Sequence, residues 1–316
     1  MPMPPEARPF TSADVSVVIP AWQAAATIGR ALASIGTQTA TPGEVIVVDD
    51  GSTDGTAAAA QAAVGLLGGI PLCVLTQTNA GAGAARNRGI EAAQGRLLAF
   101  LDADDEWLPG KLECSIERLN ATDAVLVAHD GWIVDSDGTT ARNETARRFM
   151  ESADPFVGLY RKGFIDTCSV VACRDAVIAA GGFDETLPNA QDFELWLAML
   201  KAPHTRFEVF AEPLVRYHRQ AGSIMSHTGR RLGCCLIIAR RYAPDLAGRP
   251  GGMLVSLWYR VAAIHYEALQ AHRAAGRRAD AIGAVLMLPI RLIGATAGVW
   301  WPKDRGGRPS YMATVR

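Results

Sequence analysis

The sequence predicts an α/β fold in which a central, mostly parallel sheet is flanked by helices, with a helical C-terminal region after it. Three observations favour this architecture. Short apolar runs recur between residues 15 and 100, helical patterns separate these runs, and helical patterns dominate after residue 230. Strands that alternate with helices form parallel sheets with right-handed crossovers. The 316 residues are enough for one large α/β domain with an extension.

Four apolar runs predict the first strands of the sheet. Their apolar residues are continuous rather than alternating, which indicates strands that are buried on both faces. The runs cover residues 15–19, 44–48, 72–76 and 96–100. Helical patterns lie between them at 27–35, after Thr56 and at 84–94. We expect the first 13 residues, rich in proline and polar side chains, to precede the fold as an unstructured lead.

After about residue 105 the alternation weakens, and we expect a mixed second half that continues the same sheet. Apolar runs at 124–128 and 168–173 are candidate strands, and an apolar stripe at helical spacing predicts a helix over 192–200. These patterns divide the chain into a sheet-containing domain over residues 14–229 and a helical region over residues 230–316.

Charge and cysteine content exclude some classes of protein. Lysine and arginine number 31 and aspartate and glutamate 32, so no overall basic field exists to hold nucleic acid. The six cysteines form no CxxC pair, and the first ten residues lack the apolar region of a signal peptide. We therefore expect a reduced, cytoplasmic protein with small buried cysteines and no nucleic-acid partner.

A nearly continuous apolar stretch covers residues 281–301, interrupted by Pro289 and Arg291. Three arrangements are open for it: helices packed on the main domain, an interfacial helix on an anionic membrane surface, or a membrane span. A mid-segment arginine is costly in a span. Basic residues flank the stretch, namely Arg277 and Arg278 before it and Lys303, Arg305 and Arg308 after it.

Polar side chains follow the predicted strands where the strands end. DDGSTD begins at Asp49, NAG at Asn79 and DADD at Asp102. Ligands of open parallel sheets bind at the carboxyl ends of the strands. Each group alone is also explained by a helix cap or a turn, but their occurrence at successive strand ends predicts a binding site.

Asp102 and Asp104 flank a single alanine directly after a predicted buried strand. Two carboxylates that converge there need a counter-charge, and a divalent cation carrying a diphosphate supplies one. An acidic turn before Trp107 is the alternative interpretation.

The series of motifs resembles the family 2 glycosyltransferases, whose nucleotide-sugar-binding fold is called GT-A. It comprises VSVVIPAW, EVIVVDDGSTD, NAGAGAARNRGIEAAQGRLLAFLDADD, GGFDE and QDFELWL, over about residues 14–223. Each motif is weak alone, but their combination and order are specific. The resemblance implies a GT-A domain over residues 14–229. It also implies inverting transfer of a sugar from a nucleoside-diphosphate sugar to an acceptor hydroxyl, in bacterial surface polysaccharide or glycolipid synthesis.

The resemblance also implies roles for individual residues. Asp102 and Asp104 correspond to the DxD pair that binds Mg²⁺ or Mn²⁺, with Asp104 the more direct ligand. Asp192 corresponds to the general base, although the preceding position, commonly Glu, is Gln191 here. The residues expected to contact the donor are Pro20, Ala21, Trp22, Asp50, Ser52, Arg86, Asp102, Ala103 and Asp104.

One position departs from the family pattern. A histidine that completes the metal site in many members is replaced by Gln220, and the nearest histidine is His218. His218 is therefore a candidate third ligand in a shifted register, and the alternative is a metal that carries more water.

Other functions fit less well. A dinucleotide-dependent oxidoreductase or a nucleotidyltransferase requires a glycine-rich loop after the first strand, whereas PAWQAA contains no glycine. A catalytically silent nucleotide-sugar-binding protein stays open as the alternative. We expect a glycan or a lipid-linked acceptor, and the inner face of the plasma membrane is a further partner if the apolar stretch is an interfacial helix. Five basic residues between 129 and 166 either bind an anionic acceptor or are solvated surface residues. They are Arg142, Arg147, Arg148, Arg161 and Lys162.

Overall fold

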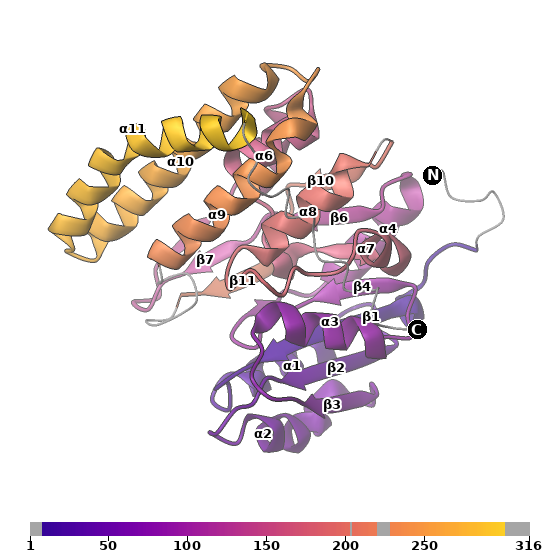
Figure 1. Cartoon of the computed structure of the whole chain (residues 1–316). Coiled ribbons are helices and arrows are strands. Elements are labelled where there is room, and N and C mark those ends of the chain that lie inside the picture. The colour runs from indigo at the N-terminus through magenta and orange to yellow at the C-terminus, as the bar shows by residue number, and fades with distance from the viewer. Residues whose placement is uncertain (1–7, 203, 220–227, 301–316) are drawn as a thin grey trace.

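The computed structural model describes residues 8–202, 204–219 and 228–300. It confirms the α/β fold: a seven-stranded sheet in the order β10-β6-β9-β4-β1-β2-β3 has helices on both faces (Figure 1). Its strands are β1 (Val15–Ala21), β2 (Glu44–Asp49), β3 (Leu72–Thr76), β4 (Leu97–Phe100), β6 (Leu126–His129), β9 (Val171–Cys173) and β10 (Phe207–Phe210).

The four predicted N-terminal strands are confirmed, and β1, β2, β3 and β4 all pair in parallel with their neighbours in this group. Helices connect these strands because consecutive parallel strands need crossover connections, and these helices pack on the faces of the sheet. The α-helices between β1 and β10 in the sequence are α1 (Ile28–Gly36), α2 (Thr56–Ala62), α3 (Ala82–Ala92), α4 (Lys111–Ala121), α5 (Thr145–Met150), α6 (Pro155–Lys162), α7 (Arg174–Ala179) and α8 (Gln191–Lys201).

The second half is mixed, as expected, and it continues the same sheet. β9 lies between β4 and β6 and is antiparallel to both, whereas β10 pairs with β6 in parallel. Only residues 171–173 of the predicted run 168–173 are a strand, because the short 3-10 helix η3 (Thr167–Ser169) precedes it. A second sheet has the order β5-β11-β7-β8. Its strands are β5 (Glu106–Trp107), β7 (Trp132–Val134), β8 (Thr140–Arg142) and β11 (Val215–His218).

Two hydrophobic cores explain why the strands are apolar at consecutive positions. Val18 belongs to the core on one face of the sheet, and Val17 and Ile19 belong to the core on the other face. Every residue of β1 is buried. A strand that faces helices on both sides has no solvent-exposed face on which polar residues would be favoured.

The expectation of an unstructured lead is wrong for residues 8–13. The Phe10 side chain is buried beneath the Arg96 guanidinium, 4.5 Å from the ring centroid. Asn120 accepts a hydrogen bond from the Phe10 amide at 2.8 Å and donates one to its carbonyl at 2.9 Å. Residues 8–13 therefore pack against α4 and the residue before β4, and residues 1–7 lie outside the described chain.

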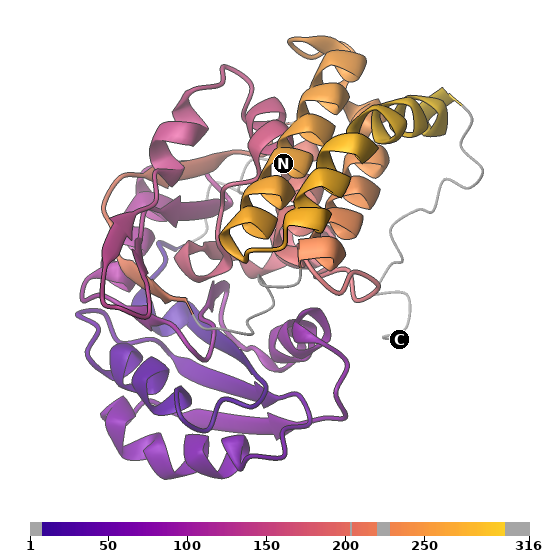
Figure 2. The ribbon, with the colours of Figure 1, turned by 90° about the vertical axis from the view of Figure 1, so that its left-hand side faces the viewer.

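The C-terminal region is helical, as predicted. It consists of α9 (Thr228–Tyr242), α10 (Gly252–Ala274) and α11 (Arg278–Trp300). α10 and α11 run side by side as a pair (Figures 1 and 2). α9 and α10 contribute Cys235, Ile238 and Val261 to the same core as one face of the sheet. The predicted boundary at 229/230 falls in the first turn of α9, and the division into two domains stays a prediction.

α11 continues through Pro289 and is long and apolar enough to cross a membrane. Its Ala281, Ala284 and Ala295 are buried, so one side of this helix packs on the protein. Trp301, Lys303, Arg305 and Arg308 lie outside the described residues.

Lys111, the first residue of α4, is a buried lysine whose titration should make the free energy of unfolding depend on pH. Its side chain is fully buried over the Trp107 ring, with Nζ 4.1 Å from the ring centroid, and burial lowers its pKa to about 7. Since the unfolded chain keeps this lysine protonated up to a pKa of about 10.4, unfolding takes up a proton between these pH values, and stability rises with pH there. We expect the free energy of unfolding to increase by about 2 kcal/mol more between pH 7 and pH 9 in the wild type than in Lys111→Met. Urea unfolding at both pH values measures this difference.

Lys201→Met, at a half-exposed lysine, is the control and should keep the wild-type pH dependence. If the free energy of unfolding changes equally with pH in the wild type and in Lys111→Met, the lowered pKa of Lys111 is wrong.

Candidate active site

The candidate site lies at the carboxyl ends of β1, β2 and β4, as the sequence predicts. β1 pairs with β4 only as far as Val18, whereas its pairing with β2 continues to Ala21. The last three residues of β1 therefore have no neighbouring strand on the β4 side. Pro20, which has no amide hydrogen to donate, is located in this unpaired part of the strand.

Asp50 follows β2 and is buried. Its carboxylate accepts hydrogen bonds at 2.8 Å from the amides of Ala80 and Gly81 and from the Gln77 side chain. Gly81 has φ +94°, a conformation that favours glycine, and is the residue before α3. Asp50 thus holds the loop that begins α3, and its contact with a donor stays a prediction.

Trp22 has an exposed indole at the end of β1, with 61% of the residue accessible to solvent. The loop around it is anchored through the next residue, because the Gln23 amide donates to Ser52 Oγ at 2.9 Å. The Ser52 amide in turn donates to Asp49 Oδ1 at 3.1 Å. Gln23 has φ +49°, which is strained for a residue other than glycine. These contacts leave the indole face open to a ligand.

Arg86, on α3, is the buried cation of the site. Its guanidinium forms an ion pair with Asp102 Oδ1 at 2.5 Å and lies 5.3 Å from the centroid of the Phe183 ring. Burial lowers the pKa of Arg86, but the carboxylates of Asp102 and Asp192 raise it by more, so the net shift is upward. Both acidic residues therefore act on the same guanidinium.

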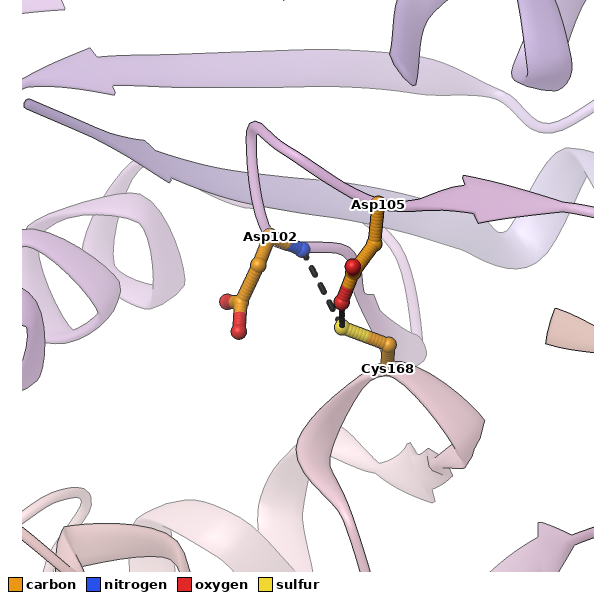
Figure 3. Close-up of side chains that lie close together, drawn as sticks. All are labelled: Asp102, Asp105 and Cys168. Atoms are coloured by element: carbon orange, nitrogen blue, oxygen red, sulfur yellow. Dashed lines mark hydrogen bonds between the residues drawn. The ribbon is translucent and has the colours of Figure 1, made fainter. Parts of the chain in front are cut away.

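In the acidic loop after β4, the Asp105 carboxylate is buried and the Asp102 carboxylate is partly exposed. Asp105 is buried and points at the Cys168 thiol, which donates to Asp105 Oδ2 at 3.2 Å (Figure 3). The Asp102 amide donates to the same sulfur at 3.2 Å, whereas the Asp102 carboxylate points to one side and is 35% exposed. Burial, followed by the charges of Asp102 and Asp104, raises the pKa of Asp105 well above its usual range.

Asp104 is half-buried, and Ala103 between the two aspartates is buried in the core. Burial and the nearby Asp102 charge raise the pKa of the Asp104 carboxyl. The Arg30 guanidinium of α1 donates to the Asp104 carbonyl and brings a compensating charge to this loop. Within the described residues, the Nε atoms of Arg30 and Arg86 are buried without a hydrogen-bond acceptor.

Asp192 lies in the first turn of α8. Its Oδ2 accepts a hydrogen bond from Thr167 Oγ1 at 3.0 Å, and its Oδ1 accepts one from the Phe193 amide at 2.8 Å. Thr167 precedes Cys168, whose sulfur contacts the Asp102 amide. Asp192 and Asp102 are therefore connected through adjacent residues of η3. The residue before α8, Ala190, holds a positive φ of 59°.

His218 ends β11, beside the acidic loop. Its amide donates to Asp105 Oδ1 at 2.9 Å, and its Nε2 lies 3.4 Å from Glu106 Oε1. Burial and the Arg30 charge lower the pKa of His218. Position 220, where the family pattern has histidine, lies outside the described residues.

The donor atoms of this site fit a hard divalent cation. In the described chain, ligand atoms of Asp102, Asp105 and Cys168 all lie within 4.8 Å of one another. The thiol is a poor ligand for Mg²⁺ or Mn²⁺, and burial raises its pKa well above the usual range. The accessible oxygen ligands are the carboxylates of Asp102 and Asp104, and the repulsion between these two groups favours a bound cation.

Sequence reasoning missed several residues of this site. The sequence could have indicated Asp105, since it adjoins the DxD pattern. No sequence pattern around Thr167, Cys168 or Arg30 indicates that these residues belong to the site. β9 runs antiparallel to β4, so the residues just before β9 lie at the carboxyl end of β4. No periodicity in the sequence indicates that arrangement.

Known proteins resemble this chain in sequence and in fold. The profile described as Glycosyl transferase family 2 matches residues 16–178, more than half of the chain. "Amylovoran biosynthesis glycosyltransferase AmsB" of Erwinia amylovora is 32% identical over 242 residues, which cover 74% of this chain and 79% of that protein. "Succinoglycan biosynthesis protein ExoO" of Rhizobium meliloti is 33% identical over 252 residues, which cover 73% and 70%.

A similar solved structure is the mannosyltransferase PcManGT from Pyrobaculum calidifontis, in complex with GDP-Man and Mn²⁺. It superposes with a TM-score of 0.64 over 96% of this chain and 90% of that chain, at 20% sequence identity. The shared fold is GT-A, as the sequence predicted. By the extent of its sequence match, the chain belongs to glycosyl transferase family 2, whose members are inverting glycosyltransferases that use nucleotide sugars.

Proposed function

We propose that this glycosyltransferase acts with Asp192 as its general base and with Asp102 and Asp104 as ligands of Mg²⁺ or Mn²⁺. The observation that carries this proposal is the common environment of the three acidic residues. Asp102 and Asp192 both raise the pKa of Arg86, and Asp102 raises that of Asp104. Since the three acidic residues lie around Arg86 and the acidic loop after β4, one substrate bound there would be within reach of all of them.

The donor site would extend from Trp22 to Arg86. The exposed indole of Trp22 offers a face on which a nucleobase stacks, beside the backbone of Pro20 and Ala21. Ser52 would support the same loop through Gln23, and Asp50 would hold the start of α3. Arg86, with its Nε atom unused by described residues, would face the diphosphate. The GDP-Man and Mn²⁺ bound to PcManGT support a nucleotide-sugar donor with a divalent metal.

The metal, when bound, would neutralise charge that develops on the departing nucleoside diphosphate. Asp102 and Asp104 would hold it, and His218 is the candidate third protein ligand because its amide is bonded to the adjacent Asp105. The side chain of His218 faces Glu106, so ligation would require rotation of its ring. Ala103 would keep the two aspartates apart by packing into the core.

Asp192 would accept the proton of the acceptor hydroxyl as the oxygen attacks the anomeric carbon. One displacement at that carbon inverts its configuration. Two hydrogen bonds, from Thr167 and from the Phe193 amide, orient the carboxylate. The buried side chains of Trp196 and Leu197 fix α8 against the core, which gives the base a defined position.

For the acceptor, we propose a glycan or a lipid-linked sugar of a bacterial surface polysaccharide or glycolipid. The amylovoran and succinoglycan biosynthesis roles in the names of AmsB and ExoO support this class. The basic residues between 129 and 166 give it less support, because most have partners in the protein. Arg142 pairs with Asp130, Arg147 with Glu144 and Glu151, Lys162 with Glu151, and Arg161 binds Ser256. The synthesis would take place in the cytoplasm.

A panel of nucleoside-diphosphate sugars tests the proposed function. We expect one donor to raise the melting temperature of the protein with Mn²⁺ present and to lose this effect with EDTA, since a ligand stabilises only the state that binds it. The same donor should then be transferred to acceptor glycans with inversion, observed by NMR of the anomeric proton. Stabilisation that is equal with Mn²⁺ and with EDTA would contradict the metal site, and a donor that binds without transfer or hydrolysis would favour a silent binding protein.

A further inference from the structure

The outer face of α11 carries an apolar stripe that nothing in the described chain covers. It consists of Ile282, Val285, Leu286, Ile290 and Ile293, and each of these residues is between 52% and 70% exposed. Their spacing of three, four and seven residues places them on one side of the helix. A soluble protein rarely exposes a continuous row of large aliphatic side chains of this length.

The side of α11 away from the stripe packs on the protein. Ala281, Ala284 and Ala295 are buried, and Leu288 and Leu292 contact the core that contains the sheet. α10, beside it, carries the buried polar residues Arg260 and His265. A membrane span would require α11 to leave this packing, or α10 to take these polar groups into lipid, and both are costly. The stripe is therefore suited to a surface rather than to a lipid interior.

Three basic residues lie on or against α11. Arg278 lies four residues before Ile282, on the same side of α11. The Arg240 side chain of α9 lies against Gly294 and Gly298, and Arg291 lines the groove between α11 and α9. Within the described residues, no carboxylate forms an ion pair with these three arginines. α11 thus carries the stripe on its outer side, with one positive charge at the start of that side and two more along the side that faces α9.

One edge of the stripe also carries an amphipathic aromatic residue. Trp258 of α10 is 49% exposed, and its Nε1 donates to Thr296 Oγ1 of α11 at 2.9 Å. Thr296 lies three residues after Ile293, beside the stripe. Tryptophan is favoured where an apolar phase meets water, because its ring is apolar and its N–H is polar.

We propose that this face of α11 rests on an anionic membrane surface, with the stripe inserted among acyl chains and the arginines among lipid phosphates. Interfacial helices combine these features. A second copy of the chain is the alternative occupant, and the experiment below distinguishes it from a lipid surface. The enzyme would then work at the bilayer that holds a lipid-linked acceptor, and this consequence alone depends on the proposed function.

Vesicle flotation of the full chain tests the proposal. We expect the protein to float with phosphatidylglycerol vesicles, and to bind them at least about tenfold more weakly when it carries Leu286→Glu and Ile293→Glu together. Leu66→Glu is the matched control, since Leu66 is also a half-exposed leucine and lies in the separate segment Ala63–Leu67. Arg240→Glu with Arg291→Glu should weaken binding to phosphatidylglycerol and leave the weak binding to phosphatidylcholine unchanged.

Several outcomes would overturn the proposal. They are an absence of flotation by the full chain, equal binding by the double glutamate variant, and an equal loss with Leu66→Glu. Protein that only detergent releases from the vesicles would indicate a span, and a dimer that the glutamates convert to a monomer would indicate a second copy. Circular dichroism spectra of all variants should match the wild type, since the substituted side chains are exposed. Donor binding with Mn²⁺, unchanged in all of them, keeps this test separate from that of the proposed active site.

Discussion

Asp192→Asn is expected to lower kcat by about 10³-fold and to leave the Kd of the nucleotide sugar within about twofold. The asparagine keeps the size of the side chain and an oxygen that accepts from Thr167 or the Phe193 amide, so the start of α8 should be preserved. It cannot accept the proton of the acceptor hydroxyl. Steady-state kinetics of transfer, together with calorimetric titration of the donor in Mn²⁺, measure the two quantities separately.

Asp175→Asn is the matched control, because Asp175 is also an aspartate in the first turn of a helix, α7, and is exposed. It should leave both kcat and Kd unchanged. Wild-type turnover by Asp192→Asn would remove this residue as the base. A large rise in Kd with little change in kcat would instead place Asp192 among the donor contacts.

Asp104→Asn is expected to weaken donor binding in Mn²⁺ on the order of 10²-fold and to abolish measurable transfer. The amide keeps the shape of the side chain but removes the negative charge that a cation needs. Because burial and the Asp102 charge already raise the pKa of Asp104, removing this charge also relieves repulsion within the loop. The variant should therefore be no less stable than the wild type when no metal is present. Calorimetry of donor binding with Mn²⁺ and with EDTA, and thermal unfolding in EDTA, measure these effects.

Asp123→Asn, at an exposed aspartate that pairs with Arg206, is the control for loss of a carboxylate elsewhere. It should bind donor as the wild type does. The critical comparison is between metal conditions. If Asp104→Asn weakens donor binding equally with Mn²⁺ and with EDTA, its role is structural and the metal assignment is wrong.

Much of the fold was predictable because its signals are local. β1, β2, β3 and β4 are short apolar runs, and each lies within two residues of its predicted bounds. The carboxyl ends of parallel strands share one edge of a sheet, so the sequence predicts that Asp50, Asp102 and the end of β1 lie together. Arg86 and Asp192 were expected near them through the family resemblance, and the structure connects both to Asp102.

By itself, the sequence determined the parallel half of the sheet, the helical C-terminal region and the family, because periodicity and motif order are properties of neighbouring residues. Only the tertiary structure decided that β9 inserts antiparallel beside β4 and that β11 pairs with β5. The first of these pairings carries Cys168 and Thr167 to the acidic loop, and the second carries His218 to Asp105. Such contacts join residues more than 60 positions apart, and their free energy depends on backbone pairing across the whole fold rather than on any local preference.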